Sequence, residues 1–240
     1  MRHRILVACL ACLLALIPSS IVLGQSDAEN RYSPVLAHLD ALVRVEFVLR
    51  VQFEGGPDQE IESETLCTAV GPQGLILCAN SELGGSFGLL GRMMGRGNVS
   101  ANPTNVEVFV GEDREGRSAR LVTRDTDRDL AWLQIEAPED ATATPEPIPF
   151  LDLNDATTAN VGDTVVTLRR MGSFFGREPL AVEGSIGAVP ERPRKLYAPS
   201  APLNVGYGVP AFTLDGAFLG ITVLQLPEAE ETARLLRNPL

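Results

Sequence analysis

Two cysteines lie at matched distances on either side of a turn, and this pair constrains the fold more than any other feature of the chain. The turn is Gly71-Pro72-Gln73-Gly74, with proline at its second position. If its two middle residues are the central pair, Cys67 and Cys78 lie directly opposite each other. Opposed strand residues have Cα atoms about 4.5–5.5 Å apart, a separation that a disulfide accepts. Residues 63–80 are therefore predicted to form an antiparallel hairpin closed by a Cys67–Cys78 disulfide; two buried free thiols are the alternative.

Short segments rich in Val, Ile, Leu and Phe recur along the chain between glycines and prolines. The chain is 45% hydrophobic and contains 22 Gly and 17 Pro, which allows a core with many turns. Besides the hairpin, strand patterns cover residues 41–53, 106–110, 118–123 and 130–135, and then 164–168, 180–189, 210–213 and 218–224. We therefore predict an all-β fold made of two small antiparallel units, with Trp132 in the core of the first.

The N-terminus has the layout of a secretory signal peptide. Basic residues at positions 2–4 precede an uncharged apolar run over residues 5–17, and small residues follow it. The run is shorter than the roughly 20 residues that a membrane-spanning helix needs. Residues 1–24 are predicted to be a signal peptide, with an uncleaved anchor as the alternative. A secreted or periplasmic protein is expected, without stable membrane insertion after cleavage.

Composition shifts divide the rest of the chain. Residues 25–39 are polar and then mixed, which indicates an N-terminal arm. Residues 227–240 are predicted to contain a C-terminal helix, because acids open the segment and arginines close it. The remaining segments are a first β unit over 40–137 with a Gly-rich loop at 84–103, a Pro- and acid-rich linker over 138–160, and a second β unit over 161–226. The Gly-rich loop is either a binding or regulatory loop or a disordered insertion.

Histidine is scarce, which limits the available chemistry. The chain contains His3 and His38, and His3 belongs to the predicted signal. Zinc sites built on two or three histidines are therefore excluded, and we expect neither a metal nor a cofactor. The net charge of −11 argues against a nucleic-acid partner, which requires clustered Lys and Arg. The neighbouring Arg169 and Arg170 are interpreted as solvated loop charges.

Three stretches, in this order, carry a family resemblance. They are VGPQGLILCANSEL at residues 70–83, RLVTRDTDRDLAWL at 120–133 and NVGYGVPAFTLDGAFLG at 204–220. They resemble segments of the HtrA/Deg branch of trypsin-like serine proteases, and the likeness extends over roughly residues 40–225. The resemblance implies two six-stranded antiparallel β-barrels, one for each predicted unit, with a groove between them.

The same resemblance places the catalytic positions, and most of them differ from the family pattern. The histidine position falls on Ser81, the aspartate is kept as Asp129, and the nucleophile position falls on Tyr207. A register shifted by one residue places Gly208 there instead, so neither register supplies a serine. Val205 takes the position of a glycine that helps form the oxyanion hole. Serine hydrolysis needs a base that accepts the hydroxyl proton near neutral pH, which a serine at position 81 cannot provide.

We therefore expect a non-catalytic peptide- or protein-binding or scaffold module with a degenerate triad at Ser81, Asp129 and Tyr207. A peptide or protein partner would bind through the inter-barrel groove or the segment 84–97, and strand addition is the expected mode in the groove. Two alternatives stay open. The first is an active serine-type hydrolase with a non-standard site that recruits His38. The second is a structural envelope component. The oligomeric state is not predicted.

Overall fold

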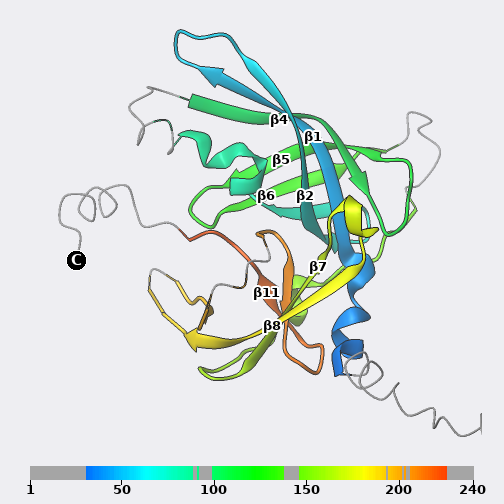
Figure 1. The fold of residues 1–240 in the computed structure, drawn as a ribbon, viewed down its shortest axis with the longest axis vertical. Helices are drawn as coiled ribbons and strands as arrows, with labels where there is room; N and C mark the ends of the chain where they lie inside the picture. The colour runs from blue at the N-terminus through cyan, green and yellow to red at the C-terminus, as the bar shows by residue number, and fades with distance from the viewer. Residues whose placement is uncertain are drawn as a thin grey trace, which may run out of the picture.

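The computed structural model describes residues 31–88, 91, 99–137, 146–192, 194–201, 203 and 206–225. The predicted signal peptide, Val205 and the predicted C-terminal helix lie outside these residues. Within them, no helix is long and apolar enough to cross a membrane. The described chain is mostly β, and it forms two units that lie one above the other in Figure 1.

The first unit is a closed six-stranded barrel, as expected. Its strands follow the order β1-β2-β3-β6-β5-β4, and all pairs are antiparallel. Their bounds are β1 Leu42–Phe53, β2 Gln59–Gly71, β3 Leu75–Ala79, β4 Val99–Phe109, β5 Arg117–Asp125 and β6 Leu130–Ile135. β4 begins at Val99, so the end of the segment expected as a Gly-rich loop is in fact strand. Its residues pair with the far end of β1, and this pairing supplies backbone hydrogen bonds that a loop would lack.

Alternate side chains of each strand fill the barrel. In β1, Val43, Val45 and Phe47 are buried while the residues between them are partly exposed, as the two-residue period of a strand requires. In β6 the buried residues include Ala131 and Leu133. Trp132 therefore lies on the opposite face and is only partly buried, so its predicted place in the core is wrong.

The hairpin and its disulfide are confirmed. β2 pairs with β3 in the predicted register, with Thr68 opposite Leu77, and the disulfide joins Cys67 to Cys78 with Cα atoms 4.6 Å apart. A bulge precedes the turn, and Gly74 adopts φ +82° there. An alanine Cβ at position 74 would lie 2.7 Å from Ile135 Cβ, so both backbone conformation and space require glycine at this position.

Removing the disulfide is expected to destabilise the protein. Both cysteines are fully buried in the barrel core, and the bond closes a short loop. Replacing both with alanine should lower the free energy of unfolding by about 3 kcal/mol or more, since the chain-entropy effect is joined by lost packing. Urea unfolding of the variant and of wild type with and without reductant tests this. An unfolding midpoint unchanged by reductant would contradict it.

The second unit differs from the predicted six-stranded barrel. Its described residues form a five-stranded open sheet in the order β11-β10-β7-β8-β9. The bounds are β7 Thr164–Arg170, β8 Pro179–Ala188, β9 Ala198–Pro199, β10 Pro210–Phe212 and β11 Phe218–Ile221. Three of these strands are short, and prolines at positions 199 and 210 each remove a backbone donor. The sheet therefore curls around its core without closing in the described part of the chain.

Segments outside the strands pack against the second unit. Residues 31–36 are helical, and a 3-10 turn, η1 Leu39–Ala41, leads into β1. Val35 is fully buried in a cluster with Phe212 and Phe218. The described part of the expected linker, residues 146–160, has no strand and contains the 3-10 turn η3 Leu153–Asp155. Within it, Leu151 is buried in the same cluster, so this part is packed rather than free.

Candidate functional site

Asp129 and Ser81 meet at the end of the first barrel that faces the second unit. β3 ends at Ala79, and the π-helical turn η2 Ser81–Gly85 follows. The Asp129 carboxylate accepts hydrogen bonds from the backbone N–H of Ser81, with Oδ1 at 2.6 Å, and from the Ser81 hydroxyl, with Oδ2 at 2.8 Å. Asp129 is 7% exposed and adopts φ 55°, a conformation that Asp tolerates better than most residues.

A donor from the second unit completes the environment of this carboxylate. The backbone N–H of Leu224, which follows β11, donates to Asp129 Oδ2 at 2.8 Å. The Asp129 carboxylate therefore accepts three hydrogen bonds, and one of them joins the two units. The buried carboxylate is thus satisfied by a serine and by backbone groups.

A half-buried arginine, Arg124, holds the turn that carries Ser81. The Arg124 guanidinium donates to Asn80 Oδ1 at 2.5 Å and to the Leu83 carbonyl oxygen at 3.0 Å. Burial lowers the pKa of Arg124. The backbone N–H of Asn80 also donates to the Asp129 carbonyl oxygen at 2.9 Å. The segment that carries Ser81 is therefore held in place by hydrogen bonds on both sides of this residue.

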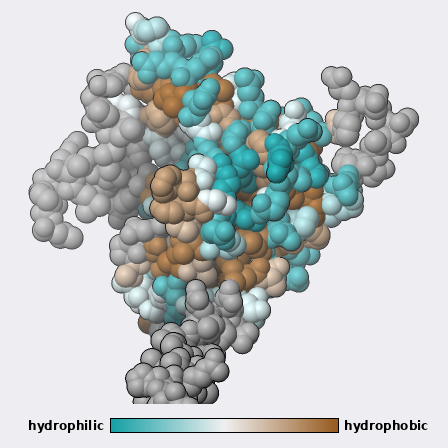
Figure 2. Space-filling view, turned by 45° about the vertical axis from the view of Figure 1, so that its right-hand side comes forward, coloured by the Kyte–Doolittle hydropathy of each residue, from teal (hydrophilic) through white to brown (hydrophobic). Residues whose placement is uncertain are grey.

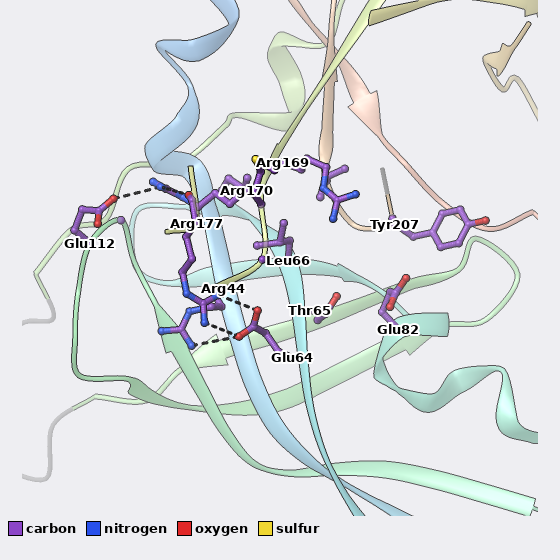
Figure 3. Close-up of a pocket in the computed structure, with 16 residues that line it drawn as sticks. Arg44, Glu64, Thr65, Leu66, Glu82, Glu112, Arg169, Arg170, Arg177 and Tyr207 are labelled. Atoms are coloured by element: carbon purple, nitrogen blue, oxygen red, sulfur yellow. Dashed lines mark hydrogen bonds and ion pairs between the residues drawn. The ribbon is translucent and has the colours of Figure 1, made fainter. Parts of the chain in front are cut away.

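Tyr207 lies opposite this turn, next to Glu82. The Tyr207 backbone lies close enough to the Glu82 carboxylate to lower the pKa of that group, and Figure 3 shows Glu82 below Tyr207 at one end of a cavity that both residues line. Burial raises the pKa of Glu82, the Tyr207 backbone opposes this, and the nearby Asp129 charge adds to the rise. Glu82 was not singled out from the sequence, although its position beside Ser81 could have indicated it.

The following glycine brings the two units into contact. Gly208 has φ +84°, and a Cβ there would lie 2.8 Å from the Ala79 backbone nitrogen and 3.1 Å from the Leu66 carbonyl oxygen. Its own carbonyl oxygen accepts a hydrogen bond of 2.9 Å from the buried Thr68 hydroxyl. The segment of the second unit around Tyr207 is therefore held directly against β2 and β3.

A cavity of about 240 Å³ lies between the units. Residues from both units line it, and four of the lining residues are arginines, namely Arg44, Arg169, Arg170 and Arg177. The Arg170 side chain is 11% exposed, so the interpretation of Arg169 and Arg170 as solvated loop charges is wrong. β7 ends beside the first barrel, and the arginines there lie at an interface rather than in an open loop. Sequence position alone does not show this.

His38 lies in a packed environment of its own. Its ring stacks on Phe212 with centroids 4.9 Å apart, and Nε2 lies 3.1 Å from the Gly216 carbonyl oxygen. Among the described residues, none of its hydrogen bonds or ring contacts involves Ser81, Asp129 or Tyr207. Its packing ties the segment before β1 to the second unit.

The structure thus brings together the three residues that the resemblance places at the triad positions. Ser81 and Asp129 are hydrogen-bonded, and Tyr207 is linked to the same turn through Glu82. Val205 lies outside the described residues. Among the described residues, no group of three His, Cys, Asp or Glu side chains is arranged to hold a metal ion.

A closed β-barrel beside a curled sheet, with a buried aspartate between them, is the arrangement of trypsin-like peptidases. The model of the trypsin-like peptidase domain matches residues 65–221, and the chain belongs to this family. Two curated relatives are named probable periplasmic serine endoprotease DegP-like. The one from Rickettsia conorii is 29% identical over 52% of this chain and 24% of its own length. The one from Hahella chejuensis is 32% identical over 48% of this chain and 24% of its own length. The match thus spans about a quarter of each relative.

An ion pair at the cavity is expected to make stability pH-dependent. Arg177 donates two hydrogen bonds of 2.9 Å to the Glu64 carboxylate, and this lowers the pKa of Glu64 from its ordinary 4.5. A lowered pKa in the folded state contributes stability above the ordinary value, and this contribution is lost as the pH falls through the lowered pKa. Because the Glu64 side chain is 42% exposed, the effect is at most about 1 kcal/mol.

Glu64→Gln should therefore be slightly less stable than wild type at neutral pH. The difference should close as the pH falls through the lowered pKa of Glu64, and it should shrink in high salt. Urea unfolding over a pH series measures it. A deficit that stays constant into the acid range would show that the amide disturbs packing rather than removing a charge.

Proposed function

We propose that this chain is a non-catalytic peptide- or protein-binding module on a trypsin-like fold. The observation that carries the proposal is the hydrogen bond of 2.8 Å from the Ser81 hydroxyl to Asp129. In the family resemblance, Ser81 stands at the position of the general base. A serine hydroxyl does not accept a proton near neutral pH, so Asp129 has no imidazole to orient.

Other features support the loss of the inherited chemistry. Tyr207 stands at the nucleophile position, and a protonated phenol is a weak nucleophile. His38, the alternative base in the sequence, has its ring stacked on Phe212. The contacts of Asp129 with Ser81 and Leu224 give this residue a structural role that explains its presence without catalysis.

The second unit offers an edge at which a peptide could add as a strand. β11 is the last strand of the sheet order, and the chain after it reaches Asp129 through Leu224. An extended peptide beside this edge would lie near the junction of the two units. We further propose that the protein is exported by its N-terminal signal peptide to the periplasm or the exterior, where an oxidised disulfide is stable.

Labelling with a fluorophosphonate probe, together with a casein cleavage assay, tests the proposal. The purified protein should neither react with the probe nor cleave casein, while an active trypsin-like protease in the same assay does both. A second sample, Ser81→Ala, separates true activity from contamination, since a contaminating protease survives this change. Labelling by the probe, or inhibitor-sensitive cleavage that is lost in Ser81→Ala or in a His38→Ala variant, would overturn the proposal.

A further inference from the structure

Basic side chains from both units gather at one end of the inter-barrel cavity. Arg44 comes from β1, Arg169 and Arg170 end β7, and Arg177 precedes β8. Arg177 and Arg44 both lie within ion-pair distance of Glu64, at 2.9 Å and 3.9 Å. Figure 3 shows this group on the side of the cavity away from Glu82, with the Arg169 side chain extending toward Tyr207.

Positive charge exceeds negative charge at this end. The four arginines are accompanied there by two lining carboxylates, Glu64 and Glu112, and by Glu46, which pairs with Arg44 from outside the cavity lining. Glu112 pairs with Arg170 at 3.3 Å, but the Glu112 side chain is 91% exposed, which weakens the pair. Burial lowers the pKa of Arg44, the like charge of Arg177 lowers it further, and the Glu64 carboxylate opposes both. Arg44 and Arg177 lie 3.9 Å and 2.9 Å from the same Glu64 carboxylate, so their like charges are close together, and an additional anion would be stabilised between them.

An exposed aromatic pair stands beside the same cavity. The 3-10 turn η4 Ser173–Phe175 follows Gly172, which lines the cavity. Phe174 is 90% exposed and Phe175 is 56% exposed, with ring centroids 5.0 Å apart. On the face drawn in Figure 2, hydrophobic surface lies in separate patches between hydrophilic regions. Phe174 and Phe175 thus form a small exposed aromatic surface that is adjacent in the chain to a residue lining the charged cavity.

We propose that this end of the cavity binds an acidic side chain, Asp or Glu, of a peptide segment, with an apolar neighbour of that residue against Phe174. The inference rests on the proposed peptide-binding function and names the class of its partner. Charge complementarity selects the carboxylate, since arginine binds carboxylates through paired N–H donors. The cavity volume of about 240 Å³ suits one or two side chains rather than a folded domain, so the partner is an extended segment.

Fluorescence anisotropy with matched peptides tests this. One labelled peptide set carries Asp or Glu beside Leu, and the other carries Asn or Gln at the same position. Acidic peptides should bind about tenfold more tightly or better, as expected for a hydrogen-bonded charge pair, and the preference should weaken with salt. Arg169→Gln and Arg170→Gln should each reduce it, while Arg120→Gln, on the exposed face of β5, should not.

A further variant, Glu112→Gln, keeps the test valid if the arginine variants fail to fold. Its side chain is almost fully exposed, and the change releases Arg170 from its carboxylate partner, so acidic peptides should bind more tightly. Equal binding of acidic and amide peptides would overturn this inference and leave the proposed function standing. Tighter binding of single-stranded DNA than of any acidic peptide would also overturn it. Absence of all peptide binding would overturn both, whereas probe labelling with an intact acid preference would overturn the non-catalytic function alone.

Discussion

Replacing Gly208 with alanine is expected to destabilise the protein by about 3–5 kcal/mol, a large share of the stability of a typical domain. Two costs combine. The residue has φ +84°, and the new Cβ would lie 2.8 Å from the Ala79 backbone nitrogen and 3.1 Å from the Leu66 carbonyl oxygen. Backbone atoms of paired strands cannot move aside cheaply, so the two units would separate locally. Urea unfolding and the proteolytic sensitivity of the junction measure the effect.

Gly206→Ala is the matched control for this change. Gly206 has a similar φ of +79°, but nothing lies within 4 Å of a Cβ at that position. It should therefore cost about 1–2 kcal/mol from backbone conformation alone. Equal losses in the two variants would show that the contact with β2 and β3 contributes nothing.

Asp129→Ala is expected to cost about 3–5 kcal/mol. The change leaves the backbone N–H groups of Ser81 and Leu224 without their acceptor, and buried donors without partners are costly. It also places alanine at φ 55°. Urea unfolding measures this loss of stability.

Two further variants, Ser81→Ala and Asp129→Asn, separate the contribution of the Ser81 hydroxyl to stability from that of the Asp129 carboxylate. Ser81→Ala removes one hydroxyl donor and should cost about 1 kcal/mol. Asp129→Asn keeps one acceptor oxygen and a residue that tolerates the left-handed region, so its loss should lie between the other two. If Asp129→Ala were as stable as Ser81→Ala, the carboxylate would not connect the two units.

Local signals in the sequence were sufficient to predict the hairpin. The turn residues fix which strand residues face each other, and Cys67 and Cys78 follow from that register. The strands of the first barrel were found by the same local patterns, and Leu130–Ile135 was predicted with its observed bounds. Trp132 was predicted in the core, but the alternation set by Leu133 and Ile135, which face the core, places it on the opposite face of β6.

Features that depend on contacts between distant segments were not predictable in this way. Closure of the barrel and the approach of Ser81 to Asp129 were predicted from the family resemblance and not from the local sequence pattern. The five-stranded second sheet depends on pairing of very short strands, whose signals are weak. Arg169 and Arg170 form an ordinary charged pair in the sequence, and their place in the cavity arises only when β7 meets β1 and β2.

The protein is expected to bind peptides and to leave them intact. Mass spectrometry of peptides retained by the immobilised protein tests this most directly. A mixture of acidic and neutral peptides is incubated for hours, washed and eluted, with Gly208→Ala as the control whose groove is disrupted. Intact peptides enriched in Asp and Glu are the expected result. Retained or released fragments with new termini, absent from a heat-inactivated control, would contradict the account, as would the failure to retain any peptide.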